Sequence, residues 1–161
     1  MKKINYLLLP LIILIFVTSC SGYKPIFSAS KLEFEIVDYD IKGNKKLGSQ
    51  IYSKLFILSK SKKNSPNIRS LYAAIEILKN KNATAKNSAG KVLEYKINLS
   101  ANVELKDYST GDVILNQNFV SYSSYKVQDQ HSETITLENK IVDDLLNKIY
   151  EDLLIRISES I

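Results

Sequence analysis

Within residues 92–106, the side chains from Leu93 to Lys106 alternate between apolar and polar without interruption, and this pattern constrains the fold more than any other feature of the chain. Successive side chains of a β-strand point to opposite faces of a sheet. The pattern therefore predicts a long antiparallel strand with one buried face and one face in water. The apolar face holds Leu93, Tyr95, Ile97, Leu99, Ala101, Val103 and Leu105, and the polar face holds Glu94, Lys96, Asn98, Ser100, Asn102, Glu104 and Lys106.

The segments around this strand complete a set of six predicted elements. Residues 107–112 predict a turn in which Gly111 can adopt a positive φ, and residues 113–125 return as the partner strand of a hairpin. Residues 32–41 and 69–78 also alternate and predict two more strands. Residues 80–90 are small and polar, which predicts a loop.

Two segments follow a helical period instead. Apolar residues at 47, 51, 55 and 58 predict an amphipathic helix over 45–59, which Asn44 can cap. A longer helix is predicted over 132–159, where Gly and Pro are absent. Its apolar stripe is marked by Ile135, Glu138, Val142, Leu145, Ile149, Leu153 and Ile157, and is widened by Ile141, Leu146, Tyr150 and Leu154.

The element order is strand, helix, strand, strand, strand, helix. It predicts an α+β two-layer sandwich, in which a mostly antiparallel sheet of about four strands packs against two helices. The hairpin strands would be about 43 Å long. The last helix would be about 42 Å long. One helix can therefore follow one hairpin along its whole length, which predicts an elongated body.

The N-terminal residues have the layout of an export signal. The chain opens Met1-Lys2-Lys3, and residues 7–17 are apolar apart from Pro10, with no acidic residue before Glu33. This apolar run is short for a membrane span, which needs roughly 20 residues. Cys20 is the only Cys, and it follows directly in the sequence Val-Thr-Ser-Cys.

The residues before Cys20 resemble the lipobox of bacterial lipoproteins. In such proteins the Cys thiol takes a diacylglycerol, the peptide is cut before the Cys, and the new amine is acylated. The resemblance implies a signal peptide over 1–19 and lipidation at Cys20. Gly22 and Pro25 then predict an irregular tether over 20–30, and the remaining length suits one domain over 31–161. The alternatives are an ordinary signal peptide with a chance Cys and an uncleaved anchor helix. Ser21, rather than the Asp of the enterobacterial inner-membrane sorting rule, favours the periplasmic side of the outer membrane.

Charge and residue types narrow the possible functions. Without Lys2 and Lys3 the chain has 20 basic and 17 acidic residues, a net charge of +3. This modest excess does not suggest nucleic-acid binding, and it suits either an anionic lipid or glycolipid partner or an ordinary periplasmic domain. The one His, His131, lies in a polar stretch, and Asp143 and Asp144 are adjacent and diverge on a helix. We find no G-x-S-x-G elbow, phosphate loop or metal ligand set, so we expect no enzyme activity, no metal and no cofactor beyond the lipid.

Two groups of lysines are candidate contacts for the phosphates of a glycolipid, where Lys acts as a point charge. Lys60, Lys62 and Lys63 form one, and Lys79, Lys81, Lys86 and Lys91 flank the predicted loop. Ordinary surface lysines remain the alternative for both. Tyr108, Tyr122 and Tyr125 suit either a protein interface or packing within the hairpin.

The mature chain as a whole resembles the LptE family, the lipoproteins of lipopolysaccharide assembly. Residues 20–27 (CSGYKPIF) resemble that family's opening of Cys, Gly, an aromatic residue, any residue, Pro, an aliphatic and an aromatic residue, with Ser21 inserted. Residues 105–111 (LKDYSTG) resemble its hairpin turn, and Ser121-Tyr122 before a long final helix resembles its close. The element order agrees across 20–161, whereas an Ala-rich helix is missing.

The resemblance implies a function in binding and transport. Such a protein plugs an LptD-like outer-membrane β-barrel, assists its assembly and helps to deliver lipopolysaccharide to the outer leaflet. We expect Lys96 and Lys106, on the polar face of the 92–106 strand, to contact the barrel, and Lys79, Lys81, Lys86 and Lys91 to contact lipopolysaccharide. The rival interpretations are an auxiliary lipoprotein or pilotin of another envelope transport system, a purely structural envelope lipoprotein, and a lipid-anchored enzyme.

Overall fold

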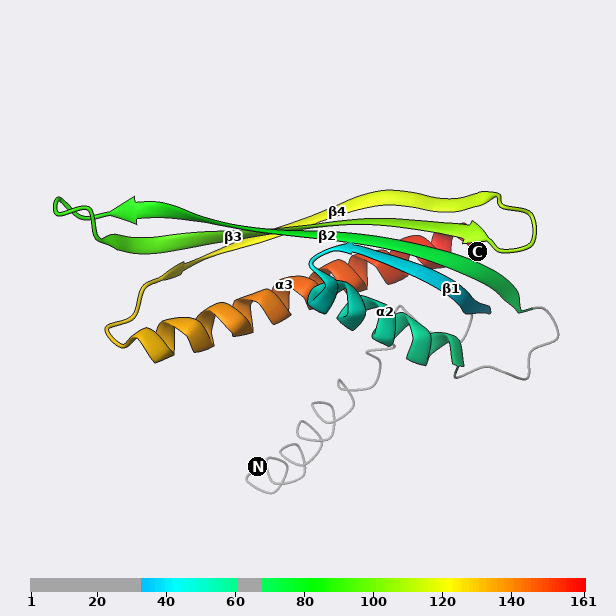
Figure 1. Ribbon diagram of the computed structural model, residues 1–161, viewed down its shortest axis with the longest axis horizontal. Helices are drawn as coiled ribbons and strands as arrows, with labels where there is room; N and C mark the ends of the chain where they lie inside the picture. The colour runs from blue at the N-terminus through cyan, green and yellow to red at the C-terminus, as the bar shows by residue number, and fades with distance from the viewer. Residues whose placement is uncertain (1–32, 61–67) are drawn as a thin grey trace, which may run out of the picture.

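A computed structural model describes residues 33–60 and 68–161. The predicted signal peptide, Cys20 and the whole predicted tether therefore lie outside the described residues, as do Lys62 and Lys63. The elements follow in the predicted order (Figure 1). They are β1 (Phe34–Gly43), α2 (Lys45–Lys60), β2 (Arg69–Lys86), β3 (Val92–Asp107), β4 (Val113–Lys126) and α3 (His131–Ser160).

The four strands form one sheet in the order β1-β2-β3-β4. β1 runs parallel to β2, and the two hairpin pairs β2–β3 and β3–β4 are antiparallel. Figure 1 shows both helices beneath one face of the sheet, with α3 running along nearly the whole length of an elongated body. The predicted α+β two-layer sandwich is confirmed.

The core lies between the sheet and the two helices. On β3 the apolar residues from Ile97 to Leu105 are almost completely buried, because that side of the strand faces the helices. Val142, Leu145, Ile149, Leu153 and Ile157 of α3 are buried as the stripe predicted, and so are Leu47, Ile51 and Leu55 of α2. Burying a side chain of this size contributes roughly 1.5–3 kcal/mol, so these stripes hold the helices on the sheet.

Local capping groups fix where the elements begin and turn. Asn44 accepts the backbone N–H of Leu47 through Oδ1 at 3.2 Å, which confirms the predicted cap of α2. In the β3–β4 turn, Asp107 Oδ1 accepts backbone N–H groups of Ser109 and Thr110, and Gly111 has φ +78°. No helix in the described part of the chain is long and apolar enough to cross a bilayer.

A β-bulge changes the alternation within β1. The register with β2 passes from Ile36 to Asp38, so Val37 has no partner on β2. An inserted residue moves the following side chains to the other face. Ile36 is therefore buried before the bulge, whereas Tyr39 stacks on α2 and Ile41 contacts α2 after it.

The loop predicted over 80–90 is wrong for most of its length. β2 continues to Lys86, and its residues from Lys79 onward pair with β3 as far as Val92. Only residues 87–91 turn, with Asn87 Oδ1 accepting the backbone N–H groups of Ala89 and Lys91. The hydrophobic pattern indicates only which side chains are buried, and residues 80–86 have few apolar side chains. These residues still form a strand because β3 supplies their backbone hydrogen bonds.

Two residues placed in apolar stripes are exposed instead. Leu93 is 46% exposed and Ile135 is 45% exposed. Leu93 is the second residue of β3, near the β2–β3 tip, where a register shift between Ala85 and Lys86 leaves it without a partner on β2. Thr134 takes the buried position at the start of α3, where its hydroxyl accepts the backbone N–H of Gln128.

Candidate functional site

The face of the sheet away from the helices is an open, mostly polar surface. The pairing register places Lys96, Asn102 and Glu104 of β3 on the same face as Asn116 and Asn118 of β4. A shallow hollow of about 260 Å³ on this face lies among Asp40, Lys42, Ala74, Ile75, Glu76, Asn102, Glu104 and Asn116. Its three carboxylates and single lysine make the centre of the face acidic.

The two lysines expected to contact a barrel both lie on this open face. Lys106 Nζ is 2.9 Å from Glu104, and Lys96 Nζ lies 4.1 Å from the ring centre of Tyr122. Leu78, Val120 and Tyr122 interrupt the polar surface and are more than half exposed. The open face therefore offers charges, amides and a few apolar side chains to a partner with a polar surface.

A second cluster joins β2 and β4 to α3 on the helix side of the sheet, at Glu138. Its carboxylate accepts hydrogen bonds from Lys79 Nζ at 2.8 Å, Lys81 Nζ at 2.5 Å and Tyr125 Oη at 2.8 Å. Lys81 Nζ also lies 4.2 Å from the ring centre of Tyr95. β1 pairs with β2 only as far as Ile77. Beyond that point the helix-facing positions of β2 change from apolar residues to these two lysines.

The partners of Glu138 determine its ionisation. Burial by itself raises the pKa of this carboxyl, but the hydrogen bonds from Lys79, Lys81 and Tyr125 outweigh that effect and lower the pKa from 4.5 to about 2. Burial lowers the pKa of Lys81, yet its hydrogen bond to Glu138 leaves that pKa raised. The cluster is therefore an ion pair that stays charged over the ordinary pH range.

Replacement of Glu138 by Gln is expected to lower the free energy of unfolding at pH 7 by about 1–3 kcal/mol, because two partly buried lysines lose their counterion. A carboxyl whose pKa is lower in the folded than in the unfolded state stabilises the fold at any pH above its unfolded-state pKa. This contribution is lost as the pH falls through the folded-state pKa. The difference between wild type and Glu138→Gln should therefore shrink between pH 4.5 and about 2. Urea unfolding across this range measures it.

Glu151→Gln is the matched control for this prediction, because Glu151 is exposed on the same helix. Its unfolding free energy should change by less than about 0.5 kcal/mol. A Glu138→Gln variant as stable as this control at pH 7 would contradict the role of the cluster.

The four lysines expected to contact lipopolysaccharide fall into two pairs. Lys79 and Lys81 are strand residues held by Glu138. Lys86 ends β2 and Lys91 follows the turn, and both are exposed at the β2–β3 tip. The structure therefore divides the predicted group into a paired half on the helix side and an exposed half at the tip.

Glu138 is the residue that sequence reasoning placed but did not interpret. It lies within the apolar stripe predicted for the last helix, where a charge is unexpected unless it is paired. That exception in the stripe is the sequence signal for the cluster. The predicted loop over 80–90 does not reveal the partners on β2, because it contains Lys81 and begins directly after Lys79.

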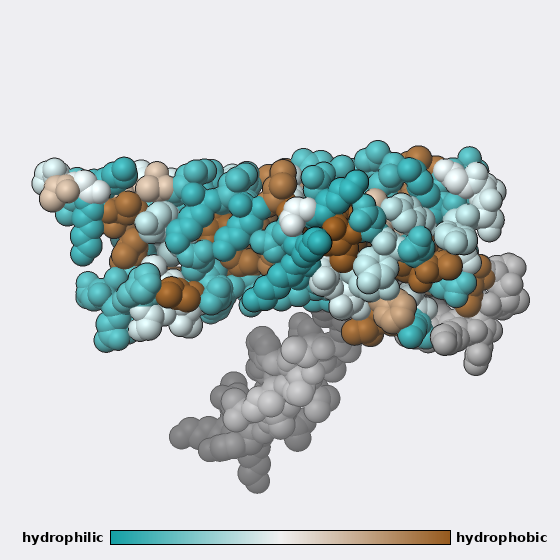
Figure 2. Space-filling view, viewed as in Figure 1, coloured by the Kyte–Doolittle hydropathy of each residue, from teal (hydrophilic) through white to brown (hydrophobic). Residues whose placement is uncertain are grey.

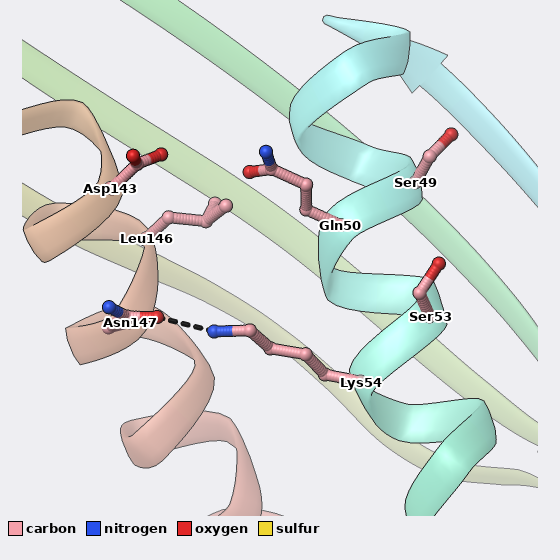
Figure 3. A pocket seen from close by; sticks show the side chains of 7 residues that line it. All are labelled: Ser49, Gln50, Ser53, Lys54, Asp143, Leu146 and Asn147. Carbon is pink, nitrogen blue, oxygen red and sulfur yellow. Dashed lines mark hydrogen bonds between the residues drawn. The ribbon is translucent and has the colours of Figure 1, made fainter. Parts of the chain in front are cut away.

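A groove of about 540 Å³ separates α2 from α3. Gln50 and Lys54 point from α2 towards α3, and Lys54 Nζ donates a hydrogen bond to Asn147 Oδ1 (Figure 3). Ser49 and Ser53 project from the other side of α2. Tyr150 Oη donates to the backbone carbonyl of Lys54 at 3.4 Å. These bonds connect the two helices, which otherwise meet the sheet separately.

The residues that the sequence offered for catalysis do not form one site. His131 is exposed at the first position of α3, Asp143 lines the groove between α2 and α3, and Asp144 is exposed on α3. Within residues 33–60 and 68–161, no group of three His, Cys, Asp or Glu side chains could hold a metal ion. Of the tyrosines, Tyr125 is buried and bonded to Glu138, whereas Tyr108 and Tyr122 are exposed.

Comparison with solved structures shows what this architecture resembles. A minor lipoprotein from Acinetobacter baumannii matches with a TM-score of 0.55 and 12% identity, over 80% of this chain and 92% of that one. An uncharacterized lipoprotein B from Nitrosomonas europaea matches with a TM-score of 0.53 and 17% identity, over 83% and 88%. The chain shares their fold. A Caulobacter crescentus protein provisionally named a lipoprotein matches at 0.52 and 15%, over 81% and 92%.

Comparison of the sequence with known protein families does not assign this chain to one of them. No protein-family model matches the chain, and no curated protein sequence matches it. At these low identities the structural matches establish the fold of the chain and not its function.

Proposed function

We propose that this chain is an envelope lipoprotein of the LptE type, anchored in the outer membrane through lipid on Cys20. In this proposal it plugs an LptD-like β-barrel, assists the assembly of that barrel and takes part in delivering lipopolysaccharide to the outer leaflet. It acts by binding and not as an enzyme. Its lipid is covalent, and it needs no other cofactor.

The open sheet face is the observation that carries this proposal. A two-layer sandwich ordinarily leaves the outer face of its sheet to water, and here that face spans four strands of an elongated body. The lumen of a large barrel is polar and is plugged in several outer-membrane proteins. Charges and amides such as Lys96, Asn102 and Lys106 suit such a wall. The lipobox-like sequence and the lipoproteins that share this fold support the same compartment.

The barrel contact is tested by reversing charge on the open face. Lys96→Glu with Lys106→Glu is expected to reduce the amount of barrel protein that co-purifies from detergent-solubilised outer membrane by at least about 30-fold, because removing one partner of interfacial charge pairs costs about 2 kcal/mol or more. Lys140→Glu with Lys148→Glu is the matched control. Both of its lysines are exposed on α3, on the opposite layer.

Each outcome of the pull-down has a distinct meaning. Recovery of one LptD-sized barrel in about equal amount with wild type and control, but not with the open-face variant, would support the proposal. Unchanged recovery with the open-face variant would place the contact elsewhere. Recovery of a secretin or an inner-membrane transporter would favour the pilotin or auxiliary alternative.

Contact with lipopolysaccharide is expected at the β2–β3 tip. Lys86→Glu with Lys91→Glu should weaken lipopolysaccharide binding about tenfold, because two exposed charges that face phosphates are reversed, and should leave the unfolding free energy nearly unchanged. Binding of labelled lipopolysaccharide and urea unfolding measure the two effects. Undiminished binding would direct attention to Lys79 and Lys81, which would first have to leave Glu138.

A further inference from the structure

A continuous stack of aromatic side chains joins β1 to α2 on the side of the body away from α3. The ring centres of Tyr39 and Tyr52 are 3.9 Å apart, and those of Tyr52 and Phe56 are 5.6 Å apart. Lys60 Nζ lies 4.2 Å from the ring centre of Phe56. The stack thus runs from the first strand to the last residue of α2.

This stack lies beside apolar side chains that point to solvent. Ile57 is 70% exposed, Val37 is 49% exposed and Tyr39 is 47% exposed. We call Val37, Tyr39, Tyr52, Phe56 and Ile57 the α2 patch. In Figure 2, apolar and weakly polar surface gathers over α2 and β1. None of these five residues takes part in the open face or in the Glu138 cluster.

The helix that carries most of the α2 patch is basic, whereas β1 places Asp38 and Asp40 on either side of Tyr39. α2 carries four lysines and no acidic residue, and Lys62 and Lys63 follow it in the sequence. The other helix, α3, carries seven acidic and three basic residues. The two helices of one layer therefore have net charges of +4 and −4. An anionic partner would be attracted to the α2 side and repelled from the α3 side.

The chain enters the fold next to this patch. β1 begins at Phe34, and Val37 and Tyr39 belong to β1. Cys20 precedes Glu33 by 13 residues. A chain of that length spans at most about 45 Å when fully extended. A lipid on Cys20 therefore keeps the α2 patch within reach of the membrane surface.

We propose that the α2 patch docks on the bilayer surface beside the lipid anchor. Phe56 and Ile57 enter the headgroup boundary, the tyrosines lie at the polar interface, and the exposed lysines Lys45, Lys46 and Lys60 contact anionic headgroups. A basic helix with exposed apolar and aromatic side chains is the type that lies in the plane of the interface, where Tyr is enriched. This inference rests on the lipid anchor of the proposed function, and it concerns the orientation of the anchored body before it enters a barrel.

The test uses the full-length lipoprotein, purified from membranes and reconstituted in vesicles of phosphatidylethanolamine with a minor fraction of phosphatidylglycerol. Ile57→Cys receives an environment-sensitive fluorophore, since lipid occupies the thiol of Cys20 and the chain has no other Cys. Val120→Cys is the matched control, because Val120 is similarly apolar and 54% exposed on the open face. Quenching by lipids that carry a nitroxide near the headgroup reports contact with the bilayer.

Label at position 57 should be quenched several-fold more than label at position 120, and Lys45→Glu with Lys60→Glu, both at exposed positions of α2, should reduce the difference. Equal quenching at the two positions in a chain of verified lipid mass would overturn this inference and leave the anchor intact. An intact mass that shows unmodified Cys20 would instead overturn the anchor, and this inference with it.

Discussion

Replacement of Gly43 by Ala is expected to lower the free energy of unfolding by about 3 kcal/mol or more. Gly43 has φ +69°, and a Cβ there would lie 2.2 Å from the backbone oxygen of Ile77. The same oxygen accepts the N–H of Asn44 at 2.7 Å, which holds the start of α2 against β2. The added methyl group would therefore both strain the backbone and displace this hydrogen bond. Urea unfolding measures the loss, with an unchanged slope expected.

Gly111→Ala separates the two causes of this loss. Gly111 has φ +78°, but no atom lies within 4 Å of the position its Cβ would take. Only the conformational cost remains, so a loss of about 1 kcal/mol is expected. If Gly43→Ala were no more destabilising than Gly111→Ala, the close approach to Ile77 would not matter for stability.

Replacement of Cys20 by Ala is expected to abolish acylation and cleavage before residue 20. Lipidation requires the thiol, and each buried CH₂ of a lipid chain contributes about 0.8 kcal/mol to membrane attachment. The variant should therefore keep its N-terminal signal and gain no lipid mass. Intact-mass measurement of the protein extracted from cells tests both expectations.

Ser21→Ala is the control for the lipidation prediction, since it changes the neighbouring residue and leaves the thiol in place. It should be acylated and cleaved as the wild type is. Acylated protein from the Cys20→Ala variant, or a wild-type chain without lipid, would contradict the assignment of the lipobox-like sequence.

Much of the fold could be predicted because the pattern of side chains and the backbone agree over most of the chain. The alternation over 92–106 corresponds to β3, and the predicted helices at 45–59 and 132–159 correspond to α2 and α3 within one residue at each end. Periodicity succeeded here because each of these elements buries one face over most of its length.

The candidate surfaces were predicted less completely. Lys96 and Lys106 lie on the open face as expected, because the alternation of a strand fixes the face of every residue. Proximity in the sequence places Lys79 and Lys81 with Lys86 and Lys91 in one candidate lipopolysaccharide site. Glu138 is separated from Lys79 by 59 positions and from Lys81 by 57 positions in the sequence. No local sequence pattern can therefore indicate that these residues pair.

The sequence alone determined the type and order of the elements, the lengths of β3 and the two helices, and the two faces of β3. Only the tertiary structure decided that β1 pairs in parallel with β2, that β2 continues to Lys86, and that Glu138 is charged within an apolar stripe. The physical reason is the range of the interactions. Burial of one face repeats along a single element and is visible in its residues. Hydrogen bonds between strands and ion pairs between layers depend on partners that only the folded chain brings together.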